Sequence, residues 1–174
     1  RKYKEEESQK MKHSAKRWLA LLLAAVPALA IDAQYAGTRN FLSYLDDNGI
    51  KYSYMGISGT NEYEQVRVVY TGDNLSEITI NCYFAKDNTR CALLCWNVID
   101  YDEAQLLPLI SELNNLNKQY RYARFYTDSS DNSVTAQFDV LLDENISGRF
   151  VHRGLCALVD IVDAAYPSLK PYQK

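Results

Sequence analysis

The sequence predicts an α+β domain in which three helices flank an antiparallel sheet, in the order helix, four strands, helix, two strands, helix. Three segments repeat apolar residues at helical spacing, whereas six shorter segments are rich in aromatic and β-branched residues. Neighbouring strand segments are joined by short polar turns, which favours antiparallel over parallel pairing. We therefore expect one helix-flanked sheet.

The first helix is expected to begin near Tyr35 and to stop at Asn48-Gly49, because glycine tolerates the left-handed conformation that often ends a helix. The second helix covers residues 100–117, where Asp102 and Gln105 resemble a capping box. Pro108 removes a backbone donor, so this helix either begins near Pro108 or kinks there.

The last helix covers residues 145–169, and we expect Tyr166-Pro167 to end it. Each of the three helices has an apolar stripe. The stripes are Tyr35, Phe41, Leu42 and Leu45; Leu106, Leu109, Ile110, Leu113 and Leu116; and Val151, Leu155, Leu158 and Val162.

Four strands are expected between the first two helices, in residues 50–57, 64–72, 75–84 and 89–99. The fourth is apolar on both faces, which is typical of a central strand. With a turn at residues 86–89, Phe84 faces Cys91 and Cys82 faces Leu93, so alternation places Cys82, Cys91 and Cys95 on one face. These cysteines are expected to line the core as reduced thiols. A diagonal disulfide between Cys82 and Cys91 is the alternative if the protein is exported.

A second hairpin is expected over residues 120–144. With a turn at Ser130-Asp131, Phe125 faces Ala136 and Ala123 faces Phe138, which makes this the inward face. The opposite face then carries a row of side chains from Tyr120, Tyr122, Arg124 and Tyr126. Two interpretations stay open. The row is either a cross-strand ladder that stabilises the sheet or a protein-contact surface, since Tyr and Arg are enriched in binding hot spots.

Residues 1–33 form an N-terminal extension, and residues 34–174 form the domain. From Met11 onward the extension has a basic stretch, an apolar run and Ala28-Leu29-Ala30, the parts of a secretory signal peptide. The run is too short, and too interrupted by Pro27, for a stable membrane span. We expect a cytoplasmic protein, or an exported one if Met11 is the true start.

The charge of the body argues against nucleic-acid binding. Residues 1–33 hold seven Lys/Arg and four Asp/Glu, so the remaining chain holds 19 − 7 = 12 Lys/Arg and 22 − 4 = 18 Asp/Glu, a net charge of −6. An acidic body repels phosphate backbones.

No catalytic signature is found in the sequence. A phosphate-binding loop and a nucleophile elbow are both missing, and His152 has only Cys156 at helical spacing, which is too little for a metal site. We expect a protein that is not an enzyme and that needs no cofactor and no metal.

Three stretches carry a family resemblance: "YTGDNLSEITI", "LNNLNKQYRYARFYTDSSDNSVTAQFDVLLDENI" and "LVDIVDAAYPSL". The body from Tyr35 to Leu169 resembles the YbjN domain family, described as bacterial sensory transduction regulators with a type III secretion chaperone-like fold. The resemblance implies this fold but transfers no active-site residues.

The expected function is that of a non-catalytic binding, adaptor or chaperone-like regulatory protein with an unknown protein partner, which includes a homodimer. Two alternatives stay open: an exported envelope protein with a structural role, and an enzyme of unrecognised type.

Overall fold

The computed structural model describes residues 32–58, 62–143 and 148–174. The chain begins with helix α2 (Ala36–Asp47) and continues through four strands to helix α3 (Leu106–Gln119), two further strands and helix α4 (Gly148–Leu169). The strands are β1 (Ser53–Ser58), β2 (Tyr63–Tyr70), β3 (Ile78–Ala85), β4 (Arg90–Asp100), β5 (Arg124–Asp128) and β6 (Ser133–Leu141). The predicted order of elements and the α+β class are confirmed.

All six strands form one antiparallel sheet with the order β1-β2-β3-β4-β6-β5. The expected registers are present, with Phe84 opposite Cys91 and Phe125 opposite Ala136. Strand β4 is central, as its apolar composition predicted, and it pairs with β3 and β6. The second hairpin therefore continues the sheet beyond β4.

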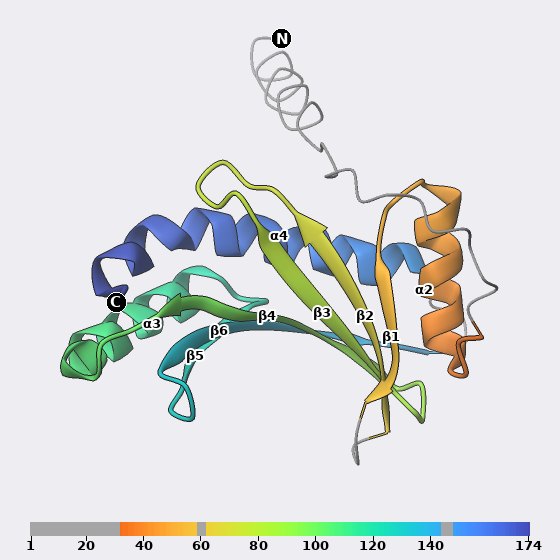
Figure 1. Ribbon diagram of the computed structural model, residues 1–174, viewed down its shortest axis with the longest axis horizontal. Coiled ribbons are helices and arrows are strands. Elements are labelled where there is room, and N and C mark those ends of the chain that lie inside the picture. The colour runs from red at the N-terminus through yellow and green to blue at the C-terminus, as the bar shows by residue number, and fades with distance from the viewer. Residues whose placement is uncertain (1–31, 59–61, 144–147) are drawn as a thin grey trace, which may run out of the picture.

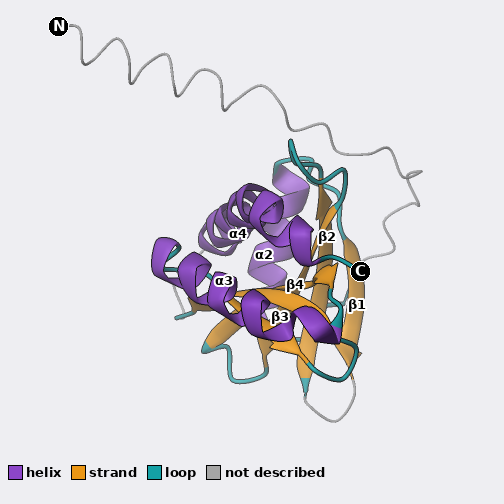
Figure 2. Ribbon diagram, turned by 90° about the vertical axis from the view of Figure 1, so that its left-hand side faces the viewer, coloured by secondary structure: helices purple, strands orange, loops and turns teal. Residues whose placement is uncertain are grey.

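The helices gather on one side of the sheet, and the core lies between them and the strands (Figures 1 and 2). The predicted stripes point into this core: Phe41 and Leu45 of α2, and Leu155 and Leu158 of α4, are fully buried. Burying side chains of this size contributes roughly 1.5–3 kcal/mol each, which fixes the helices against the sheet. Gly49 follows α2 with a φ of +64°, as expected for a helix stop.

The second helix begins before Pro108. A short 3-10 turn (Glu103–Gln105) leads into α3, and the Asp102 side chain accepts a hydrogen bond from the Ala104 N–H, 3.0 Å away. Pro108 is the third residue of α3, where a backbone N–H would have no intrahelical partner, so of the two alternatives the helix that begins near Pro108 is observed.

The prediction that Tyr166-Pro167 ends the last helix is wrong. Helix α4 continues through Pro167 to Leu169. Proline leaves the carbonyl one turn earlier without its helical donor, here that of Asp163. The side-chain amide of Asn74 donates to this carbonyl over 3.0 Å, and this tertiary hydrogen bond replaces the missing one.

Cys82, Cys91 and Cys95 are buried in the core, on the face that alternation predicted, and Cys156 is half-buried on α4. All four are free thiols in the structure. Cys82 and Cys91 lie diagonally across the β3–β4 pair. Their redox state stays a prediction.

The start of α2 is fixed by a buried carboxylate. No side chain of α2 caps its first turn. Instead, Glu64 of β2 accepts hydrogen bonds from the backbone N–H groups of Gln34 (2.6 Å) and Tyr35 (2.9 Å) and from the Tyr54 hydroxyl (2.6 Å). Burial alone would raise the pKa of Glu64, but these hydrogen bonds outweigh it and hold the pKa below its usual value.

Candidate binding face of the sheet

The side of the sheet opposite the helices is a candidate binding surface, and we call it the open face. Three neighbouring rows of cross-strand pairs define it. The first row crosses all six strands as Ser53, Arg67, Asn81, Leu94, Gln137 and Arg124. The second row is Gly56, Gln65, Tyr83, Ala92 and Asp139. The third row contains Tyr63, Ala85, Arg90 and Leu141.

An aromatic string runs across the open face. The rings of Tyr63 and Tyr83 meet edge to face, with 6.5 Å between their centroids. The hydroxyl of Tyr83 accepts a hydrogen bond from the indole Nε1 of Trp96 over 3.3 Å. Trp96 is still 41% exposed, so this string offers accessible aromatic surface held by neighbouring side chains.

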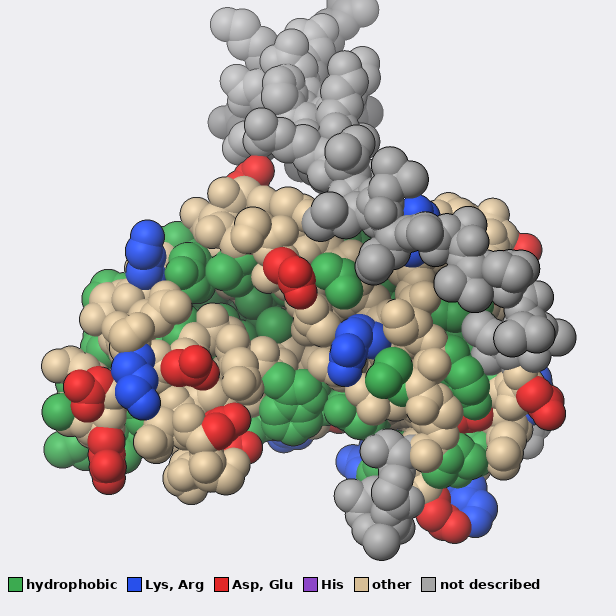
Figure 3. Space-filling model, viewed as in Figure 1, with side chains coloured by type: hydrophobic (Ala, Val, Ile, Leu, Met, Phe, Trp, Pro, Cys, Tyr) green, Lys and Arg blue, Asp and Glu red, His purple; other side chains and the backbone are tan. Residues whose placement is uncertain are grey.

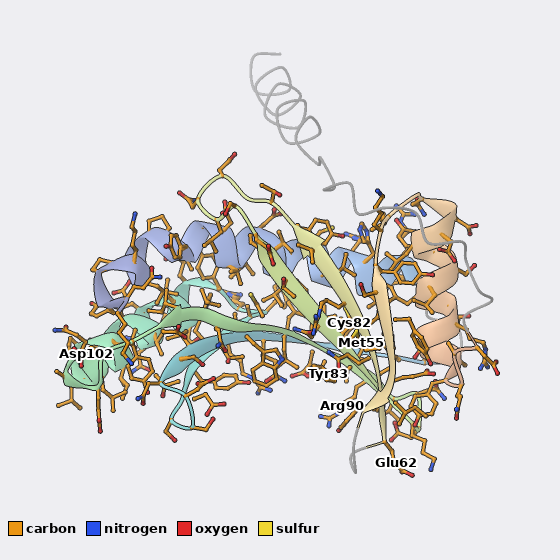
Figure 4. The ribbon with its side chains drawn as sticks, viewed as in Figure 1. Met55, Glu62, Cys82, Tyr83, Arg90 and Asp102 are labelled. Atoms are coloured by element: carbon orange, nitrogen blue, oxygen red, sulfur yellow. The ribbon has the colours of Figure 1, made fainter. Side chains whose placement is uncertain are left out.

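Arg90 lies at one end of this string. Its guanidinium donates to the Tyr63 hydroxyl over 2.6 Å, and its carbon lies 5.8 Å from the centre of the Tyr63 ring. Figure 4 shows Tyr83 and Arg90 in the same part of the view as Met55 of β1, which is 48% exposed. In Figure 3, hydrophobic and basic side chains lie next to each other in the middle of this view.

Alternation along β4 places Trp96 on the open face together with Ala92 and Leu94, and a bulge follows directly after it. The register of β4 against β6 shifts between Cys95 and Ile99, and Asn97 has a φ of +52°. Asparagine tolerates this left-handed conformation better than most residues. The aromatic string therefore ends beside an irregularity in the β4–β6 ladder.

The structure separates the four residues of the predicted row. Arg124 and Tyr126 lie on the open face: Arg124 forms a 3.0 Å ion pair with Asp139, and the Tyr126 hydroxyl donates to Gln137 over 3.4 Å. Tyr120 and Tyr122 precede β5 and are not in the ladder, so the predicted single row is corrected.

The physical reason for this correction is the position at which β5 begins. The amide of Asn117 in α3 accepts from the Phe125 N–H (2.7 Å) and donates to the Phe125 carbonyl (3.0 Å), so α3 occupies the outer edge of β5. The chain between α3 and β5 forms a bend. There Tyr120 packs on Phe125, and Tyr122 packs on Phe138, with 6.4 Å and 6.2 Å between the ring centroids.

Sequence reasoning missed Tyr63, Tyr83, Arg90 and Trp96 as a group. Alternation along the third strand, which identified its polar side from Glu77 to Asn81, already places Tyr83 on that side. The alternation that puts Cys91 and Cys95 in the core likewise places Trp96 on the opposite face of the sheet.

A hollow of about 380 Å³ lies on the helix side, between the end of α2, the end of β2 and α4. In its wall, the Nε2 atom of His152 is 3.2 Å from the Tyr70 hydroxyl and 3.5 Å from the Cys156 sulfur. Burial lowers the pKa of His152. Burial, with a smaller effect of the Asp160 charge, raises the pKa of Cys156 to about 11.

This pair is therefore a neutral thiol beside a neutral imidazole at pH 7. Cysteine nucleophiles instead depend on a lowered thiol pKa. Over the residues that the structure describes, His, Cys, Asp and Glu do not form any group of three that could hold a metal ion.

The helices within the described ranges are too short or too polar to cross a bilayer. The apolar run that follows Met11, on which the export prediction depends, lies outside the described residues.

Comparison with known proteins gives a structural neighbour for this arrangement. No family model matches the sequence, and no curated protein matches it. The crystal structure of YbjN, "a putative transcription regulator from E. coli", superposes with a TM-score of 0.55 at 10% sequence identity. The match covers 80% of this chain and 96% of YbjN. The resemblance in sequence is thus supported by a YbjN-like fold.

Proposed function

We propose that the protein is a non-catalytic binding or adaptor protein that contacts a protein partner through the open face. The observation that carries the proposal is the aromatic string of Tyr63, Tyr83 and Trp96 with Arg90 at its end. Tyr, Trp and Arg are the residues most enriched in binding hot spots, because they combine a large contact area with a polar group.

The order of this surface also favours binding. Ordering a mobile side chain at an interface costs roughly 0.5–1.5 kcal/mol. The ring of Tyr63 contacts Tyr83, and the Tyr83 hydroxyl accepts from Trp96, so these side chains are held in place before a partner arrives. Arg90 is held by its hydrogen bond to Tyr63. Little further ordering is needed on this side of the interface.

The chemistry of the hollow supports a role without catalysis. Cys156 and His152 are a nucleophile and a base that the fold brings together, and burial keeps both uncharged at neutral pH. YbjN is described as "a putative transcription regulator", and a regulatory adaptor role is in line with that description.

The proposal is tested with the double variant Tyr83→Ser/Trp96→Ser. The matched control is Phe150→Ser, which removes a 57% exposed aromatic side chain from α4, on the helix side. Wild type and both variants are used for affinity capture from cells of the source organism, and bound proteins are quantified by mass spectrometry. Light scattering measures self-association, and circular dichroism verifies that both variants are folded.

We expect the double variant to lose at least one protein, or the self-association, that the wild type and Phe150→Ser retain. If the folded double variant captures the same proteins in the same amounts and has the same assembly state as the wild type, the proposal is wrong.

A further inference from the structure

We infer that the open face binds an acidic, extended polypeptide segment with an apolar side chain between its acidic residues; this inference rests on the proposed function. Three arginines project from its three rows, Arg67, Arg90 and Arg124, and the rows contain one acidic residue, Asp139. Glu77 and Asp128 lie toward the other end of the sheet. The middle of the open face is thus basic on a body whose net charge is −6.

Two of these arginines form no ion pair with the described residues, so their charges are available to a partner. The charge of Arg124 is balanced by its ion pair with Asp139. Arg67 donates to the neutral side chain of Asn81 over 3.2 Å, and Arg90 donates to the neutral hydroxyl of Tyr63. Within the described parts of the chain, no carboxylate forms an ion pair with either guanidinium, although the charges of Asp139 and Asp87 act on Arg90 from a longer distance. Each guanidinium can therefore donate hydrogen bonds to a carboxylate of a partner.

The register sets the spacing of the two acidic groups. Arg67 and Arg90 lie two strands and two rows apart, which corresponds to about 10 Å across the strands and about 13 Å along them. The separation is therefore about 16 Å, which an extended peptide spans with about five residues. Tyr83 lies in the row between them, so a residue in the middle of such a peptide contacts the aromatic string.

A polypeptide fits this surface better than a nucleic acid. Sequence-independent nucleic-acid binding needs a track of many Lys/Arg on phosphates, whereas this face offers two arginines on an acidic domain. A peptide with two carboxylates on either side of an apolar side chain complements this face, where two arginines lie on either side of the aromatic string.

Synthetic peptides of about twelve residues are the probes. One carries two Glu four positions apart with Leu midway between them, because alternation along an extended chain then points all three side chains to the same side. Matched peptides replace both Glu by Gln, replace both by Lys, or place the two Glu next to each other. A single-stranded DNA of similar length tests nucleic-acid binding. Fluorescence anisotropy measures each affinity for the full chain at low and high salt.

We expect the spaced Glu peptide to bind roughly tenfold or more tightly than the Gln peptide, with weaker binding at high salt. The double variant Arg67→Gln/Arg90→Gln should remove this preference. The control Arg153→Gln, on exposed α4 surface, should preserve it within about twofold.

The inference is overturned if the Glu and Gln peptides do not differ, including the case in which neither binds, or if the DNA binds more tightly than the Glu peptide. The same arginine double variant in the capture and light-scattering experiments separates the two proposals. One outcome is that Tyr83→Ser/Trp96→Ser loses a partner, or self-association, that Arg67→Gln/Arg90→Gln retains. In that case the inferred acidic ligand is wrong, and the proposal that the open face binds a protein is still supported. If neither variant changes capture or assembly state, both proposals fail.

Discussion

Asn74 and Asp163 bind each other through side chain and backbone at once. The Asp163 carboxylate accepts hydrogen bonds from the backbone N–H groups of Asp73, Asn74 and Leu75, each at 2.9 Å. In return the Asn74 amide donates to the Asp163 carbonyl over 3.0 Å. The β2–β3 loop is thus fastened to α4. Two of the three stretches that resemble the YbjN family, "YTGDNLSEITI" and "LVDIVDAAYPSL", meet here and have a structural role.

Replacing Asp163 with Asn should destabilise the protein by about 1–3 kcal/mol, because the loop N–H groups lose a charged acceptor. Asp160→Asn is the matched control, one turn earlier on α4. Burial, with a smaller effect of the Asp163 charge, raises the pKa of Asp160, so removing its charge should be neutral or slightly stabilising. Urea unfolding at pH 7 measures both. Equal stability of Asp163→Asn and wild type would refute the role of this carboxylate.

The effects of Asn74→Ala and Pro167→Ala should be coupled. In the wild type, Asn74→Ala leaves the Asp163 carbonyl without the donor that replaces the missing N–H of Pro167, at a cost of about 1 kcal/mol. Alanine at 167 restores a helical N–H, so the same Asn74 substitution should cost less in that background. A double-mutant cycle of unfolding free energies should give a coupling of about 0.5–1 kcal/mol. If the two changes in unfolding free energy are strictly additive, the Asn74 side chain does not compensate for the missing N–H of Pro167.

Replacing Glu64 with Gln should destabilise the protein by about 1–3 kcal/mol at pH 7. The pKa of Glu64 is lowered in the folded state, so its contribution is fully present above the pKa of an unfolded glutamate, about 4.3, and is lost as pH falls through the folded pKa. Urea unfolding at pH 7 and near pH 3 should show a smaller difference between variant and wild type at the lower pH.

Glu62→Gln is the control for this series. Glu62 forms an exposed ion pair with Lys86, and such pairs contribute at most about 1 kcal/mol. A Glu64→Gln effect that is as small as that of Glu62→Gln, or one that grows as pH falls, would contradict the assignment.

The cysteines should react in two classes. Titration with a thiol reagent should count four thiols after denaturation, because we expect Cys82 and Cys91 to be reduced. In the native protein only Cys156 should react, and slowly at pH 8, since burial raises its pKa to about 11. Burial raises the pKa of Cys95 further, to about 12. The variant Cys156→Ser should abolish the native reaction. A count of two after denaturation would instead support the Cys82–Cys91 disulfide.

The two hairpins and their inward faces follow from the sequence. A short turn fixes which residues face each other, and alternation then assigns every side chain to a face. This is why the pairs Phe84–Cys91 and Phe125–Ala136 are predicted correctly, and why the core positions of Cys82 and Cys95 are predicted with them. The apolar stripes of the helices follow from local periodicity in the same way.

Tertiary structure alone decides the rest, because the contacts join segments far apart in the chain. Pairing of β4 with β6 completes the first row of the open face, and the amide of Asn117 determines that Tyr120 and Tyr122 stay outside β5. The hydrogen bond from the Asn74 side chain to the Asp163 carbonyl allows α4 to continue through Pro167. Local propensity covers a few neighbouring residues, whereas these positions depend on hydrogen bonds that form only when the sheet and helices are assembled.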